Sequence, residues 1–168
     1  MSEISFQLNG KLVTVEEKPG ELLLDLLRER LEMTGTKCAC REGECGACTV
    51  LMDGEPVNSC MVLASQALGR NITTIEGLAH EDGTLNPVQQ AFLDTGAIQC
   101  GFCTPGMVLA AKALLDRCEH PTREQAAEAL AGNICRCTGY VKIIDAVMAA
   151  AEAIDQKNKE KKENETNG

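Results

Sequence analysis

The sequence is poor in aromatic residues, which limits the core that it can build. It has no tryptophan, one tyrosine and three phenylalanines in 168 residues. Aliphatic residues and alanine still raise the hydrophobic fraction to 44%, so we expect a modest core. Small domains with limited apolar burial are often stabilised by bound metal. A metal-supported fold is therefore our first hypothesis.

The chain also lacks a basic excess and a long apolar run. Asp and Glu outnumber Lys and Arg by 25 to 16, and the formal net charge is −9. Nucleic-acid binding needs clustered Lys and Arg to neutralise phosphates, so this class of function is excluded. We interpret the acidic balance as a solubilising surface rather than a field that steers a basic partner. No stretch approaches the roughly 20 apolar residues of a membrane-spanning helix, so no membrane contact is expected.

A secretory signal is not visible either. The first seven residues, MSEISFQ, contain no basic segment followed by an apolar run. Disulfide scaffolds belong to oxidising compartments, so we do not interpret the ten cysteines as a disulfide framework. The sequence predicts a cytoplasmic protein whose thiolates bind metal.

The spacing of the cysteines is the most informative feature that is present. Eight of the ten form two sets of four. The first set is Cys40, Cys45, Cys48 and Cys60, and the second is Cys100, Cys103, Cys135 and Cys137. The first set has the C-x4-C-x2-C spacing of plant-type ferredoxins, and a [2Fe–2S] cluster takes four thiolates. The two sets therefore predict two [2Fe–2S] clusters and a role in electron transfer.

Zinc is the competing assignment for these cysteines. The C-x2-C and C-x-C pairs of the second set would also suit a tetrahedral four-cysteine zinc site, whereas the first set is much less zinc-like. The run typical of bacterial [4Fe–4S] ferredoxins is absent. Cys38 and Cys118 remain outside both sets, and we expect them to be structural thiols.

The first half, residues 1–76, is predicted to be a β-grasp domain like that of plant-type ferredoxins. Alternating apolar residues flank Asn9-Gly10, and Asp53-Gly54 marks a second hairpin. Leucines on one face predict a helix over 21–32, and residues 72–75 are expected to form the closing strand. The first cysteine loop lies between this helix and the second hairpin.

Residues 77–155 are predicted to form a second domain, a four-helix bundle that carries the second cysteine set. Periodicity and capping residues predict helices over 87–95, 105–117, 123–131 and 140–153. The second set falls in the two turns that join these helices in pairs, so facing pairs would bring its cysteines to one end of the bundle. Residues 156–168 are mostly Lys, Glu and Asn, and a disordered tail is expected there. The fold class is therefore α+β.

Four motifs carry a resemblance to a known family. They are TGTK at 34–37, GECGACTV at 43–50, QCGFCTPG at 99–106 and GNICRCTGY at 132–140. With these motifs in this order, the chain resembles the small [2Fe–2S] subunit of the xanthine dehydrogenase, or molybdenum hydroxylase, family. Ala39 is a departure, because the family usually has glycine before the first ligand, but it leaves the ligand set intact.

The resemblance implies a heteromeric oxidoreductase. A large partner subunit would hold molybdenum on molybdopterin and hydroxylate the substrate. Electrons would then pass through the two clusters to an FAD-binding medium subunit or another acceptor. The residues that contact the pterin in this family correspond to Gln99 and Cys137 here. From its position alone, Gln99 could instead be a structural helix C-cap.

The chain itself contains no candidate for substrate chemistry. It has no nucleophile–base pair, Gly-rich nucleotide motif or catalytic carboxylate pair. On the resemblance alone, we expect the substrate of the complex to be a purine or another N-heterocycle rather than an aldehyde or carbon monoxide. Two alternatives stay open, namely a free-standing ferredoxin-like electron carrier and a structural four-cysteine zinc protein.

Overall fold

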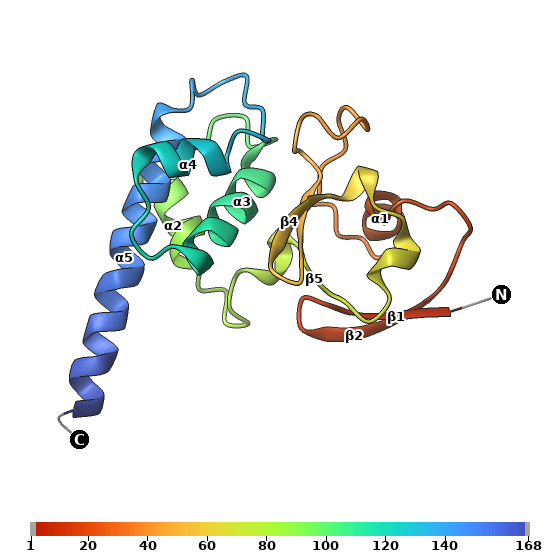
Figure 1. Ribbon diagram of the computed structural model, residues 1–168, viewed down its shortest axis with the longest axis horizontal. Coiled ribbons are helices and arrows are strands. Elements are labelled where there is room, and N and C mark those ends of the chain that lie inside the picture. The colour runs from red at the N-terminus through yellow and green to blue at the C-terminus, as the bar shows by residue number, and fades with distance from the viewer. Residues whose placement is uncertain (1–2, 167–168) are drawn as a thin grey trace.

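The chain folds as two halves that lie side by side in a computed structural model, which describes residues 3–166 (Figure 1). A sheet forms the centre of the first half, and helices form the second. The last helix, α5, runs out beyond the rest of the helical half. The α+β architecture predicted from the sequence is confirmed.

The first half is built around a mixed sheet. Its strands are β1 (Glu3–Leu8), β2 (Lys11–Glu16), β3 (Thr49–Met52), β4 (Glu55–Asn58) and β5 (Asn71–Thr73). Their order is β2-β1-β5-β3-β4, with β1 and β5 parallel and the other neighbours antiparallel. Asn9-Gly10 forms the turn between β1 and β2, and Asp53-Gly54 forms the turn between β3 and β4. All four residues have the positive φ of tight hairpin turns. Both predicted hairpins are therefore confirmed.

The predicted helix over 21–32 is shorter and wider than expected. α1 spans only Leu23–Asp25, and the chain continues as a π-helical turn over Leu26–Arg30. Leu26 and Leu27 are both fully buried in the core that α1 shares with the sheet. The buried leucine face that the sequence predicts is therefore present, but a π-helical turn rather than a regular α-helix carries part of it.

The second half contains the four predicted helices. They are α2 (Pro87–Asp94), α3 (Thr104–Arg117), α4 (Arg123–Ala129) and α5 (Val141–Thr166). The Asn86 side chain accepts a hydrogen bond from the Val88 amide, and Thr122 accepts one from the Gln125 amide, so these two predicted N-caps are present. Thr104, which the sequence predicts as the cap of the second helix, is instead the first residue of α3, whose N-cap is Cys103. The turn after α2 and the turn after α4 carry the second cysteine set.

The expectation of a disordered tail over 156–168 is wrong for residues 156–166, which continue α5. This segment contains neither glycine nor proline, and its Lys, Glu and Gln residues have high helix propensity. The Lys159 ammonium also pairs with the Asp155 carboxylate one turn earlier, at 2.6 Å. Residues 167–168 lie outside the part of the chain that the structure describes.

α3 joins the two halves by packing against β3 and β4. Leu51 of β3 belongs to the core of the helical half, and the Arg117 guanidinium donates to the Glu55 carboxylate at 2.6 Å. The closing strand β5 ends at Thr73, earlier than expected, because Ile75–Gly77 forms a 3-10 turn into the second half. Between residues 3 and 166, no helix is long and apolar enough to cross a membrane.

Candidate functional site

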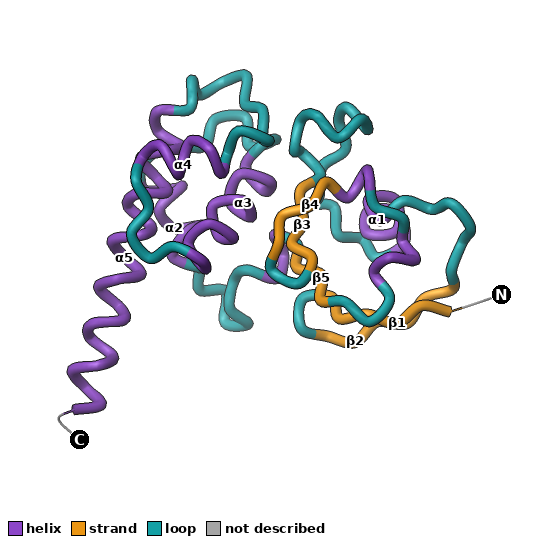
Figure 2. Tube along the Cα trace, viewed as in Figure 1, coloured by secondary structure: helices purple, strands orange, loops and turns teal. Residues whose placement is uncertain are grey.

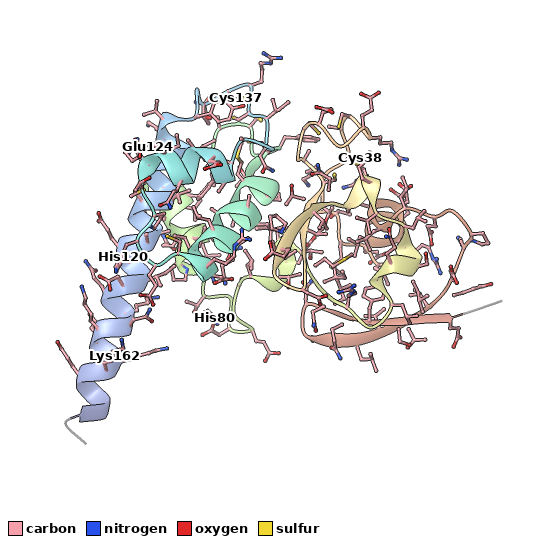
Figure 3. All side chains as sticks on the ribbon, in the orientation of Figure 1. Cys38, His80, His120, Glu124, Cys137 and Lys162 are labelled. Carbon is pink, nitrogen blue, oxygen red and sulfur yellow. The ribbon has the colours of Figure 1, made fainter. Side chains whose placement is uncertain are left out.

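The loops that carry the two cysteine sets lie along the same edge of the molecule (Figure 2). The loop before β3 forms this edge on the sheet half, and the turns after α2 and α4 form it on the helical half. Figure 3 labels Cys38 on the first of these loops and Cys137 on the last. Residues far apart in sequence are thus gathered in one region.

The first cysteine set is brought together as two pairs of thiols. The Cys40 thiol contacts Cys45, and the Cys48 thiol contacts Cys60. Cys48 and Cys60 are each 3% exposed. The Ser59 hydroxyl and amide donate to the Cys48 carbonyl at 2.7 and 3.3 Å. The β3–β4 hairpin therefore returns the fourth cysteine to the loop.

Backbone amides of the first loop point at the Cys40 sulfur. The Glu42 amide donates to Cys40 Sγ at 3.4 Å. The pKa of Cys40 is lowered to about 7. The Glu42 amide has the largest effect, and the thiol and amide of Cys45 and the Glu44 amide contribute less. Burial has the opposite effect at the other pair, where it raises the pKa of Cys48 to about 11. Donors to sulfur stabilise the thiolate, which is the form that binds a metal.

The second set also forms two pairs. The Sγ atoms of Cys100 and Cys137 lie 3.6 Å apart, and the Cys103 thiol contacts Cys135. Cys103 is the N-cap residue of α3, whereas Cys118 is at the opposite end of that helix. The turns after α2 and α4 therefore meet at one end of the bundle, as the helix pairing predicts.

Thr138 and Tyr140, which follow Cys135 in the sequence, support the position of Cys135. The Thr138 hydroxyl donates to Cys135 Sγ at 3.1 Å, and the Cys135 amide donates to Tyr140 Oη at 2.8 Å. Burial acts to raise the pKa of Cys135, but the Thr138 hydroxyl and the following backbone amides outweigh it and lower the pKa to about 7. Burial raises the pKa of Cys103 to about 12. Cysteine spacing does not identify Thr138 or Tyr140, although both lie in the motif at 132–140.

The pairing of the sulfurs fits the donor set of a binuclear cluster. In a [2Fe–2S] cluster each iron takes two thiolates and shares both bridging sulfides, so the four ligands divide two and two. Both cysteine sets divide in this way. In the described residues, no three His, Cys, Asp or Glu side chains are gathered as ligands for one ion.

Cys38 lies beside the first set and has a partner of its own. Its side chain packs with Cys48 and Cys60, and its sulfur accepts a hydrogen bond from Arg41 Nε at 3.2 Å. The Arg41 guanidinium also pairs with the Asp25 carboxylate. These contacts link Cys38 to α1 and support its interpretation as a structural thiol.

Gln99, Cys100 and Cys137 are exposed at the second set. Figure 3 places Cys137 at the outer edge of the helical half. The interpretation of Gln99 as a helix C-cap is wrong, because α2 ends at Asp94 and is capped by Thr95. The exposed side of this set is therefore accessible to another molecule.

Two domain families match the chain. A family described as a 2Fe-2S iron-sulfur cluster binding domain matches residues 6–75, and a family described as a [2Fe-2S] binding domain matches residues 74–148. The first range contains the first cysteine set, and the second range contains the second set. Each half of the fold thus corresponds to one cluster-binding family.

Relatives of the whole chain narrow the class. The nicotinate dehydrogenase small FeS subunit of Eubacterium barkeri is 53% identical over 89% of this chain and 94% of that protein. A probable xanthine dehydrogenase subunit from Bacillus subtilis (strain 168) is 50% identical over 79% of this chain and 76% of that protein. The crystal structure of quinoline 2-oxidoreductase from Pseudomonas putida 86 matches with a TM-score of 0.87 and 45% identity, over 92% of this chain and 96% of the matched chain.

These matches define a two-domain iron–sulfur protein with a β-grasp domain followed by a helical [2Fe–2S]-binding domain. The chain belongs to the small [2Fe–2S] subunits of the xanthine dehydrogenase, or molybdenum hydroxylase, family.

Proposed function

We propose that this chain is the electron-transfer subunit of a heteromeric molybdenum hydroxylase. The observation that carries the proposal is the pairing of eight thiols on neighbouring loops at one edge of the molecule. Two clusters held there would form a short relay. The chain contributes the path for electrons, and the chemistry on the substrate belongs to a partner.

The ligands are assigned by set. Cys40, Cys45, Cys48 and Cys60 hold the first cluster, and Cys100, Cys103, Cys135 and Cys137 hold the second. When bound, each cluster supplies a one-electron carrier whose potential depends on hydrogen bonds to its sulfurs and on burial. The Glu42 amide and the Thr138 hydroxyl are such donors. Residues 1–76 and 77–155 are taken as the two cluster-binding domains.

The proposed partners are a molybdopterin-binding large subunit and an FAD-binding medium subunit. Two of the relatives are themselves named as subunits of dehydrogenases, which supports assembly with other chains. Gln99 and Cys137 are assigned to the pterin contact, since both are exposed at the second set. Electrons would enter at the second cluster and leave from the first. The proposed location is the cytoplasm, because thiolates that bind metal suit a reducing compartment.

The proposed substrate of the complex is an N-heterocycle such as a purine. The compounds in the names of the three similar proteins, nicotinate, xanthine and quinoline, all contain a nitrogen heteroaromatic ring. Recognition of this ring is assigned to the large subunit. A purified complex that oxidises aldehydes or carbon monoxide but no N-heterocycle would contradict this part of the proposal.

The apolar surface at the second set favours a docked subunit over a free-standing carrier. Phe102 and Ile134 are 46% and 51% exposed, and they line a hollow together with Cys100 and Cys137. Large apolar side chains gathered on a surface are typical of interaction sites. A carrier that diffuses between partners would leave this apolar hollow exposed to water whenever it is not bound to a partner.

The proposed function predicts the metal content of the chain. Anaerobically purified protein should contain about four irons and about four acid-labile sulfides, because two clusters each hold two of both. Elemental analysis and a sulfide assay measure these contents. A full equivalent of zinc, or about two irons, would show that one set has been misassigned.

Affinity purification from the native cell distinguishes a docked subunit from a free-standing electron carrier. A docked subunit should bring a large chain and a flavin-containing chain with it.

A further inference from the structure

The two cysteine loops are joined by a buried side chain, Asn133. This residue lies in the turn after α4 and is 6% exposed. Its Nδ2 donates to the Gly46 carbonyl at 2.9 Å and to Thr49 Oγ1 at 3.1 Å. Gly46 lies between two ligands of the first set, and Asn133 lies two residues before Cys135 of the second. A single amide therefore connects the two candidate metal sites.

The backbones around Asn133 approach each other closely. A Cβ atom on Gly46 would lie 2.3 Å from the Gly132 carbonyl oxygen, and one on Gly106 would lie 2.4 Å from the Gly46 carbonyl oxygen. Gly106 belongs to the first turn of α3, just after Cys103. The Ile134 amide also donates to the Cys45 carbonyl at 2.9 Å. The Asn133 Nδ2 would lie 2.5 Å from a Cβ atom on Gly46 and 2.8 Å from one on Gly106. Three cysteine-bearing segments therefore meet closely around the Asn133 side chain.

The first loop has hydrogen bonds of its own at this point. The Thr49 hydroxyl and amide both donate to the Gly46 carbonyl, at 2.7 and 3.1 Å. Loss of the Asn133 amide would therefore leave the Gly46 turn closed. What would be lost is the side-chain connection between the two cysteine loops.

We propose that Asn133 is a positioning residue that fixes the separation of the two clusters. This inference rests on the proposed function, because it needs both clusters to be present. Electron tunnelling between carriers weakens steeply with distance, so a relay benefits from loops held at one separation. Asn133 contacts neither set of ligand sulfurs and acts through the loops that hold them.

The test measures the interaction between the two clusters in the full chain. A reduced [2Fe–2S] cluster has an unpaired electron, and two such spins split each other's electron paramagnetic resonance signals by an amount that falls with the cube of their distance. The wild-type chain, loaded with both clusters and reduced with dithionite, should show this splitting at low temperature. N133A should keep both signals and the full iron content but show a narrower splitting.

Asn58 provides the matched control. Its Nδ2 also donates to a carbonyl of the first loop, that of Gly43, at 2.6 Å, but Asn58 lies in the same half as that loop. N58A should leave the splitting unchanged. N133D is a second test variant, because it keeps the size of the side chain and cannot donate to the Gly46 carbonyl. It should narrow the splitting as N133A does, and it serves if the alanine variant fails to load.

The outcomes separate the inference from the proposed function. Two signals with an unchanged splitting in the Asn133 variants would overturn the inference alone, and so would a loaded wild-type chain without any splitting. A wild-type chain that cannot hold two [2Fe–2S] clusters would overturn the proposed function and the inference with it. Equal narrowing in N58A would show a general loosening of the first loop and would also overturn the role of Asn133.

Discussion

Replacing Cys60 with serine should remove the first cluster and leave the second intact. Cys60 is 3% exposed, contacts Cys48 and is carried by the turn that follows β4. Without its thiolate one iron of the first cluster lacks a ligand. The second set is held by α3 and by the turns after α2 and α4. We expect about half of the wild-type iron, and one electron paramagnetic resonance signal in place of two.

Cys38 is the control for this substitution. It packs against Cys48 and Cys60, but its sulfur accepts a hydrogen bond from Arg41. C38S should therefore keep both clusters and the full iron content. The assignment of the first ligand set would be wrong if C38S lost the first cluster while C40S kept it.

Replacing Gly46 with alanine should strongly destabilise the chain. Gly46 has a φ of +65°, and its Cβ would lie 2.3 Å from the Gly132 carbonyl oxygen. The left-handed conformation costs about 1–2 kcal/mol for a residue with a Cβ, and overpacking costs about 1–3 kcal/mol more. A loss of about 2–5 kcal/mol in the free energy of unfolding is expected. Thermal unfolding of the loaded chain measures it, with a fall in Tm of roughly 2–4 °C for each kcal/mol.

Two other glycines separate the causes of this effect. Gly132 lies on the opposite side of the same contact, has no positive φ and has open space where a Cβ atom would lie. G132A should therefore leave Tm nearly unchanged. Gly10 has a φ of +79° and also has open space, so G10A should show the conformational cost alone. If G46A is no worse than G10A, the close approach of the two halves is not rigid.

Local signals were sufficient to predict most of the fold. The Asn9-Gly10 and Asp53-Gly54 turns, and the Asn86 and Thr122 caps, depend on residues close in sequence, and each is found where it is expected. The grouping of the cysteines follows from their spacing in the same way. The π-helical turn over Leu26–Arg30 departs from the prediction, because the leucine pattern indicates which face is buried but does not distinguish a π-helical turn from an α-helical one.

Contacts between the two halves could not be predicted. The Asn133 side chain meets a loop 87 residues earlier in the sequence, and nothing around Asn133 indicates its partner. The interaction of Arg41 with Cys38 and Asp25 likewise depends on how the first loop folds back on α1. The helical end of α5 was missed for another reason, since its composition suits either a solvated tail or an exposed helix with pairs such as Asp155–Lys159.

Rapid-mixing spectroscopy of the assembled complex tests the central claim most directly. The complex containing C60S is mixed with substrate, and the bleaching of the second cluster and the reduction of the final acceptor are followed separately. We predict that the second cluster is reduced at a rate close to that of the wild-type complex, while acceptor reduction falls sharply because the first cluster is missing. Acceptor reduction at the wild-type rate would contradict the account, since the first cluster would then lie off the electron path. Loss of second-cluster reduction in a correctly assembled complex would contradict the proposed order of the two clusters.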